Sequence, residues 1–328
     1  MSVVDIHTHM LSERYLELLT TRSDGVYRIR DGIGDVRVLD KGGAPFLTLT
    51  EGMFDYPMRI KEMDAAGVDL AVISLSAPNV YWGSADTSAE VARLTNDQLA
   101  AAQREHPDRI RFLASLPWQH PDRAVAELER AVGLGAVGVM VLGNVAGASL
   151  TEEAFAPVWS AIDRRGLPVL VHPTTPPGVE QMDVSRYHLV WSAGFTYDTT
   201  LALSRMILDG FFDRYRQLKI IGSHAGGYLP FLMPRLDQGF HSFASTRESI
   251  DRLPSSYLPQ LYVDSIAYSE AALRFTVDTF GADHVLYGSD YPHKCGRMDQ
   301  MLELLDAGTS GQATTAIRGR NAERLFAL

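Results

Sequence analysis

The chain has 328 residues, of which 46% are hydrophobic and 21% charged, as expected for a globular protein with a large core. Its formal net charge of −10 argues against a nucleic-acid partner, and without a long apolar run or a secretory pattern we expect neither a membrane partner nor export. The single cysteine, Cys295, excludes an intrachain disulfide and favours a reducing, cytoplasmic location.

Eight short and mostly apolar runs predict buried strands. They cover residues 3–9, 69–76, 110–117, 136–142, 167–172, 218–224, 261–266 and 285–290. Between them, amphipathic patterns predict helices at residues 56–66, 87–105, 121–134, 152–165 and 198–209, and from residue 302 onward. The alternation predicts an α/β protein with a (β/α)8 TIM barrel, and a doubly wound open sheet is the competing architecture.

Two segments interrupt this alternation. Residues 11–50 are polar and glycine-rich, and residues 240–258 also lie outside the strand and helix pattern. Insertions of this kind often line or cover the site of a barrel. We therefore expect one domain, residues 1–328, with a small insertion at about residues 11–50 that holds a hairpin over the C-terminal face.

Residues able to bind a metal ion follow or end four of the eight predicted strands. They are His7, His9, His172, His224 and Asp290. Side chains alternate along a strand, so His7 and His9 point to the same side, and the C-terminal ends of barrel strands meet at one rim. Imidazole and carboxylate ligands suit one divalent ion, with Zn²⁺ expected first and Mn²⁺ or Fe²⁺ as alternatives. His293, close to Asp290, is a candidate neighbour of that ion.

Four motifs in this order resemble the amidohydrolase superfamily. They are Asp-Ile-His-Thr-His at 5–9, Val-His-Pro at 171–173, Gly-Ser-His-Ala-Gly-Gly at 222–227 and Gly-Ser-Asp-Tyr-Pro at 288–292. Within the superfamily, the chain is similar to the branch of aminocarboxymuconate-semialdehyde decarboxylase and related metal-dependent, non-oxidative decarboxylases. Further similar segments at residues 59–64, 191–200, 230–235 and 321–326 extend the resemblance over most of the chain.

The resemblance implies a role for each matching residue. His7, His9, His172 and Asp290 match the metal ligands, and His224 matches the general acid/base. Arg235 matches an arginine that reaches the site of a neighbouring subunit and holds a substrate carboxylate, which implies a homodimer. Many superfamily members carry a carbamylated lysine that bridges two metals, but residues 141–144 contain no lysine, so we expect one metal ion.

One segment departs from the pattern of the semialdehyde decarboxylase. Residues 45–54 contain no arginine, although that enzyme has arginines there. We therefore expect no guanidinium group on this side of the substrate pocket to bind a carboxylate through two hydrogen bonds. Aromatic side chains predict a more apolar pocket, suited to an aromatic ring. The substrate-binding candidates are Phe46, Phe54, Trp191 and Phe195, together with Arg235.

These features predict a decarboxylase of a small aromatic or unsaturated carboxylic acid. In that reaction the metal orients the substrate and His224 protonates the carbon that loses CO₂. The alternative is a metal-dependent hydrolase of a small amide or lactone, in which Asp290 can also take the proton of the attacking water. A non-catalytic metal-binding protein is a third reading, which five metal-capable residues on one rim do not favour.

Overall fold

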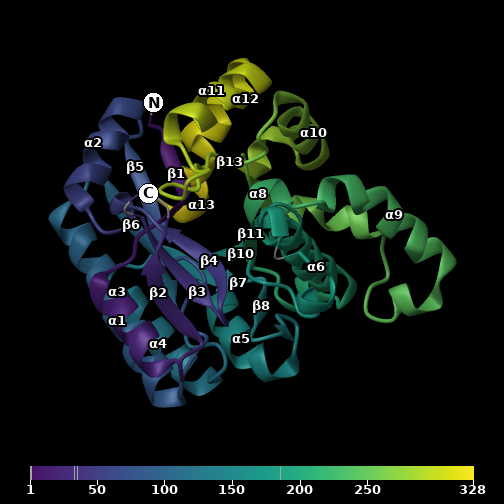
Figure 1. The fold of residues 1–328 in the computed structure, drawn as a ribbon. Helices are drawn as coiled ribbons and strands as arrows, with labels where there is room; N and C mark the ends of the chain where they lie inside the picture. Colours follow the sequence, from purple (N-terminus) through teal and green to yellow (C-terminus); the bar gives the residue numbers. More distant parts are fainter. Residues whose placement is uncertain (1, 33, 35, 185) are drawn as a thin grey trace.

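The fold is seen in a computed structural model that describes residues 2–32, 34, 36–184 and 186–328. Eight parallel strands form a barrel that helices surround (Figure 1). In sheet order the strands are β1 (Val4–His9), β5 (Leu70–Ser74), β6 (Ile110–Ser115), β7 (Gly138–Leu142), β10 (Pro168–His172), β11 (Lys219–Gly222), β12 (Leu261–Asp264) and β13 (Val285–Leu286). The predicted TIM barrel is confirmed, and the open sheet is excluded.

The barrel closes between its first and last strands. The amide of Ile6 donates to the carbonyl of Tyr287 (3.0 Å), and the amide of His9 donates to the carbonyl of Tyr291 (2.8 Å). Thr8 also forms an isolated parallel bridge with Tyr291. The segment that follows β13 is thereby held against the C-terminal half of β1, where the two histidines lie.

Helices surround the barrel, and most of them follow the predicted positions closely. These are α2 (Tyr56–Ala66), α3 (Ala85–Glu105), α4 (Pro121–Gly133), α5 (Ala156–Arg165), α6 (Phe195–Leu208), α11 (Met298–Gly308), α12 (Gly311–Thr315) and α13 (Asn321–Phe326). A further helix, α10 (Glu270–Phe280), was not predicted. Local signals set their ends: the Asp55 carboxylate accepts from the amide of Met58 at the start of α2, and Gly67 ends it with φ 74°. Inside the barrel, an apolar cluster includes Ile6, Leu170 and Phe326, the last from α13.

The insertion after β1 is larger than the predicted hairpin. It contains α1 (Glu13–Arg22) and a three-stranded antiparallel sheet of β2 (Tyr27–Asp31), β3 (Arg37–Lys41) and β4 (Ala44–Leu49). Because it follows the C-terminal end of β1, it lies on the predicted face of the barrel. The Thr50 hydroxyl donates to the carbonyl of Pro292 (2.8 Å), which ties the insertion to the loop after β13.

A long helix that sequence patterns did not predict leads into the second interruption at residues 240–258. α9 (Leu229–Ser242) projects from the side of the barrel and is followed by short 3₁₀ turns (Figure 1). Phe231 on this helix and Phe243 just after it are 77% and 62% exposed. Apolar side chains this exposed, on an element that projects from the body, are typical of an interaction surface.

Five predicted strands end earlier than expected, and two of these changes concern candidate site residues. The run 218–224 is a strand only to Gly222, and the run 285–290 only to Leu286. His224 and Asp290 instead adopt left-handed backbone conformations, with φ of 52° and 57°. A left-handed residue cannot continue a strand, so both side chains are presented from turns just beyond the strand ends.

Candidate metal centre

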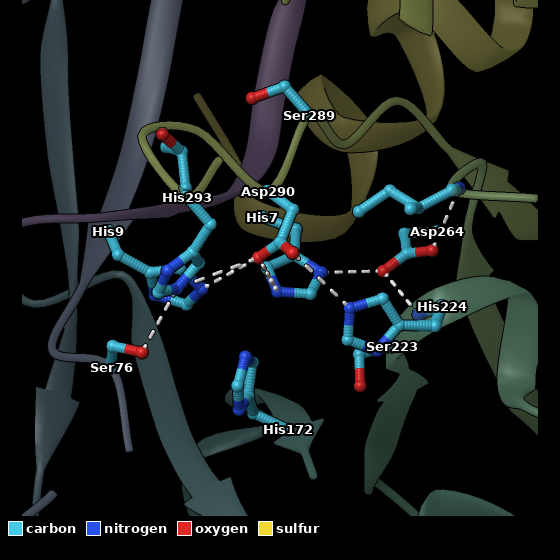
Figure 2. A network of polar contacts seen from close by, with 12 residues as sticks. His7, His9, Ser76, His172, Ser223, His224, Asp264, Ser289, Asp290 and His293 are labelled. Atoms are coloured by element: carbon cyan, nitrogen blue, oxygen red, sulfur yellow. Dashed lines mark hydrogen bonds and ion pairs between the residues drawn. The ribbon is translucent and has the colours of Figure 1, made fainter. Parts of the chain in front are cut away.

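The structure brings together the side chains that the sequence places far apart (Figure 2). Each of His7, His9, His172 and Asp290 offers a buried ligand atom, and these atoms all lie within 4.8 Å of one another. The ring centroids of His7 and His9 are 5.1 Å apart, so the two histidines of β1 do share a side. The cluster lies at the C-terminal end of the barrel, formed by β1, by the last residue of β10 and by the turn after β13.

The three imidazoles of this cluster use the same ring nitrogen to contact the surrounding protein. Each makes a hydrogen bond with its Nδ1 atom to a neighbouring protein group. The pairs are His7 with Asp264 Oδ2 (2.6 Å), His9 with Ser74 Oγ (3.1 Å) and His172 with the carbonyl oxygen of Pro173 (2.9 Å). An imidazole whose Nδ1 is fixed by a hydrogen bond presents Nε2 to a metal ion.

The atoms that face the centre of the cluster have no hydrogen-bond partner among the described residues. They are Nε2 of His7, Nε2 of His9 and Oδ1 of Asp290. Asp290 Oδ1 lies 3.5 Å from His7 Nε2 and 3.3 Å from His9 Nε2. Buried polar atoms without partners are costly, and one cation coordinated by all three would satisfy them. The donor set therefore fits a divalent metal ion.

Burial and neighbouring charges set the protonation of this cluster. Burial lowers the pKa of His9 to about 3, and burial beside the other histidines holds the pKa of His172 well below its usual range. Burial would raise the pKa of Asp290, but the electrostatic influence of the neighbouring histidines, first of all His293, holds it well below its usual value. Neutral imidazoles and an ionised carboxylate are the forms that coordinate metals.

The pKa of His7 shifts in the opposite direction. Burial alone would lower it, but the hydrogen bond to Asp264 and the charges of nearby carboxylates raise it. Asp264 ends β12 and is completely buried. The sequence predicted a strand at residues 261–266 but did not identify Asp264 as a site residue. Its position at the C-terminal end of a strand is the same signal that marked the other candidate site residues.

His224 lies beside the four clustered residues and borders a cavity. Its Nε2 is 3.6 Å from Asp290 Oδ2, and its side chain is 10% exposed. The Nδ1 atom is buried and has no partner among the described residues. A partly exposed imidazole next to a cavity can exchange a proton with a bound molecule.

The cavity next to His224 has a volume of about 340 Å³ and is mainly apolar. Its aromatic wall consists of Trp191, Tyr228, Phe231, Tyr268 and Phe275. Among the residues that the structure describes, no Asp, Glu, Lys or Arg side chain lines it. The rings of Trp191 and Tyr268 are 5.9 Å apart in an edge-to-face arrangement. Such a wall favours a flat, apolar molecule.

The other predicted substrate-binding residues do not line this cavity. Phe46 packs on Tyr27 in the small sheet, with ring centroids 5.9 Å apart. Phe54 lines a separate cavity of about 310 Å³ beside α1 and α3. Phe195, the first residue of α6, is half-buried. Arg235 is exposed on α9, and the described part of the chain offers it no hydrogen bond or ion pair.

His293 lies close to the cluster, as the sequence suggested. Its Nε2 is 3.2 Å from Ser76 Oγ and 3.9 Å from Asp290 Oδ1, and its ring centroid is 5.1 Å from that of His9. Burial lowers its pKa. His293 therefore borders the centre from the side opposite His224 in Figure 2.

Comparisons with known proteins agree with this picture. The family model described as amidohydrolase matches residues 4–328. The chain is 30% identical to a 2-amino-3-carboxymuconate-6-semialdehyde decarboxylase of Dictyostelium discoideum, over 92% of this chain and 85% of that protein. It is 31% identical to a gamma-resorcylate decarboxylase of Rhizobium radiobacter, over 82% of this chain and 86% of that protein.

Solved structures are similar over the whole chain. A 5-carboxyvanillate decarboxylase from Sphingomonas paucimobilis superposes with a TM-score of 0.86 at 26% identity, covering 100% of this chain and 99% of that one. A dihydroxybenzoic acid decarboxylase from Polaromonas, with bound manganese and 2-nitroresorcinol, has a TM-score of 0.83 at 25% identity, covering 100% of this chain and 97% of that one.

Within the described residues, no helix is long and apolar enough to cross a bilayer.

Proposed function

Because the chain belongs to the amidohydrolase family, and because its relatives are named decarboxylases of aromatic or muconate acids, we propose that it is a metal-dependent, non-oxidative decarboxylase of a small aromatic carboxylic acid. The observation that carries the proposal is the set of buried, unpartnered atoms of His7, His9 and Asp290 that face one another next to His224 and an apolar cavity.

The metal would be held by the four clustered residues. These are His7, His9, His172 and Asp290. A divalent ion bound there supplies positive charge that polarises and orients the oxygen atoms of the substrate. One ion is expected, because residues 141–144 offer no lysine for a second and Asn144 there donates to Asp198 (2.9 Å). Zn²⁺ suits three imidazoles, and Mn²⁺, which a solved relative contains, suits the carboxylate.

His224 would act as the general acid. When the bond between the ring carbon and the carboxylate breaks, the electron pair stays on the ring carbon, and that carbon must take a proton. The His224 ring lies at the edge of the cavity and is not needed to complete the metal site. We infer that it donates this proton to the ring carbon, that CO₂ leaves neutral, and that the imidazole is reprotonated from solvent.

The cavity wall indicates the kind of acid. A flat ring would pack against Trp191 and Tyr268, and its carboxylate would face the metal centre. Within one chain, the described residues provide no cationic side chain in this wall to accept a second carboxylate. A substrate with one carboxylate and an otherwise uncharged ring is therefore favoured over a dicarboxylate, in agreement with the arginine-free segment 45–54.

A homodimer would bring one cation to this site. Arg235 is exposed and unpaired within the described residues, and it lies one helical turn after Phe231, which borders the cavity while 77% exposed. We infer that α9 packs against a second copy and that Arg235 reaches the partner's substrate carboxylate. If so, Arg235→Ala raises KM, and mixing it with His224→Asn restores activity, because each mixed dimer contains one site with both wild-type residues. Mixtures no more active than the separate variants would contradict the shared site.

The proposed reaction can be tested by product analysis. Purified protein is stripped of metal, reloaded with Mn²⁺ or Zn²⁺, and incubated with 2,6-dihydroxybenzoate, 5-carboxyvanillate and related acids, while CO₂ and the decarboxylated ring are measured. We expect both products in equal amounts and none from metal-free protein. Hydrolysis of lactones or amides, with no CO₂ from any acid, would instead identify a hydrolase.

A further inference from the structure

One buried carboxylate connects the metal cluster to His224. Asp264 accepts four hydrogen bonds and is 0% exposed. Its Oδ2 atom accepts from His7 Nδ1 (2.6 Å) and from the backbone amide of His224 (2.8 Å), and its Oδ1 atom accepts from the backbone amides of Ala225 (2.8 Å) and Ile266 (3.0 Å). Two carboxylate oxygens offer about four acceptor positions, so all the acceptor positions of this side chain are occupied.

The backbone that Asp264 holds has an unusual conformation. His224 has φ 52° and ψ 56°, and Ala225 has φ 56° and ψ 25°, so two successive residues other than glycine are left-handed. This conformation is unfavourable for L-residues, particularly for alanine, and persists only where the surroundings enforce it. The two consecutive amides of this turn donate to the two oxygens of Asp264, and Figure 2 shows the contact between Asp264 and His224.

We propose that Asp264 is a positioning residue that couples the metal ligand His7 to the acid His224. The same oxygen that fixes the Nδ1 of His7, and so directs its Nε2 toward the metal centre, also anchors the amide of the residue that carries the acid. A shift of this carboxylate therefore displaces the ligand and the acid together. The inference rests on the proposed roles of His7 and His224.

Asp264→Asn is the direct test, because an amide has nearly the same shape but only one acceptor oxygen. Whichever way it turns, the amide nitrogen faces two N–H donors and two hydrogen bonds are lost. We expect metal affinity, measured by competition with a chelator, to fall about 10–100-fold. We also expect kcat at saturating metal to fall about 10–100-fold with little change in KM, because the acid is displaced while the aromatic side chains of the cavity wall are kept.

Asn321→Ala is the matched control for loss of buried hydrogen bonds. Asn321 is 1% exposed and donates to the carbonyls of Ala282 (2.8 Å) and Val285 (2.7 Å), near the start of β13 and away from the cluster. A purely structural role for Asp264 would make both variants alike: less stable, with unchanged metal affinity and unchanged kcat per folded molecule. That outcome would overturn the proposal.

A double variant separates the two connections. Ala225→Gly removes the cost of the left-handed turn, so D264N/A225G should recover part of kcat but none of the metal affinity, since the glycine does not change the contact between residue 264 and His7. The double variant is also the protein to measure if D264N alone does not fold. If D264N loses metal affinity but keeps its kcat at saturating metal, Asp264 acts on His7 alone, and the proposed coupling to His224 is refuted.

The proposed reaction and this inference fail in different ways. If the wild-type protein releases CO₂ from none of the acids, the proposed decarboxylase function is wrong. The metal affinity of D264N and the position of its His224 ring in a crystal structure then still decide the inference. An unmoved ring with unchanged affinity would overturn it, and a displaced ring with weakened affinity would support it.

Discussion

His224→Asn is the variant that best separates the proposed acid from the proposed metal site. His224 has φ 52°, and asparagine tolerates the left-handed region better than alanine or most other residues. The backbone amide at this position donates to Asp264 (2.8 Å) in any variant that preserves the turn. Asparagine therefore removes the imidazole while the turn, Asp264 and the orientation of His7 are kept.

The expected effect follows from the geometry. His224 is outside the four-residue set whose ligand atoms lie within 4.8 Å, so the metal should stay bound at close to one ion per chain. A positioned general acid contributes typically about 10²–10⁴-fold to a rate, which corresponds to about 3–5 kcal/mol in the activation free energy. We expect kcat to fall by that factor, and KM to change little, because the aromatic wall is untouched.

Two measurements on the same preparation decide this prediction. Elemental analysis gives the metal content, and release of CO₂ from the best acid found for the wild-type protein gives kcat and KM. A kcat close to that of the wild type would show that another group delivers the proton. A metal-free variant would show that His224 is a ligand and that the separation of roles is wrong.

Three further predictions concern the ligands, the packing and the pH dependence. His172→Ala should lose bound metal by elemental analysis, because it removes one of four ligands, and a fully metallated variant would refute that role. Gly143→Ala should lower the unfolding free energy by about 1–3 kcal/mol in urea, because its Cβ would meet the Asp198 carboxylate; Gly133→Ala, with open space around it, should not. Burial raises the pKa of Asp198 to about 6 from 3.8, so the folded protein binds this proton more tightly than the unfolded chain. The resulting stabilisation is present near pH 4 and is lost as the pH rises through 6, by at most about 3 kcal/mol. Asp198→Asn should remove this part of the pH dependence in urea unfolding, and an unchanged slope would contradict it.

The sequence was sufficient for the barrel and for the cluster of histidines and Asp290. Apolar runs bounded by glycine and polar residues marked all eight strands, because parallel strands buried on both faces are almost wholly apolar. Once the strands were placed, His172 and Asp290 were expected near His7 and His9 despite separations of more than 160 residues. The topology of a barrel, rather than any local signal, brings such residues together.

Asp264 and the residues of the aromatic wall were harder to predict from the sequence. The run 261–266 reads as an ordinary strand, and only the fold shows that its aspartate faces His7 rather than solvent. Of the four aromatic residues singled out, Trp191 lines the cavity, while Phe46 packs on Tyr27 and Phe54 borders another cavity. An aromatic side chain packs equally well in a core or a pocket, so its type does not reveal which it faces.

A small irregularity in β1 explains how two histidines come to face a barrel whose interior is otherwise apolar. Val4 and Ile6 belong to the interior cluster, and strict alternation would then direct His7 and His9 outward. Pairing with β5 shifts between Asp5, opposite Ala71, and Thr8, opposite Ile73, which places one extra residue in β1. Such a bulge redirects the side chains that follow it. The bulge after Ile6 turns the histidines inward, as the left-handed turn at Asp290 does for its carboxylate, so the site depends on departures from regular strands that no periodic pattern in the sequence can show.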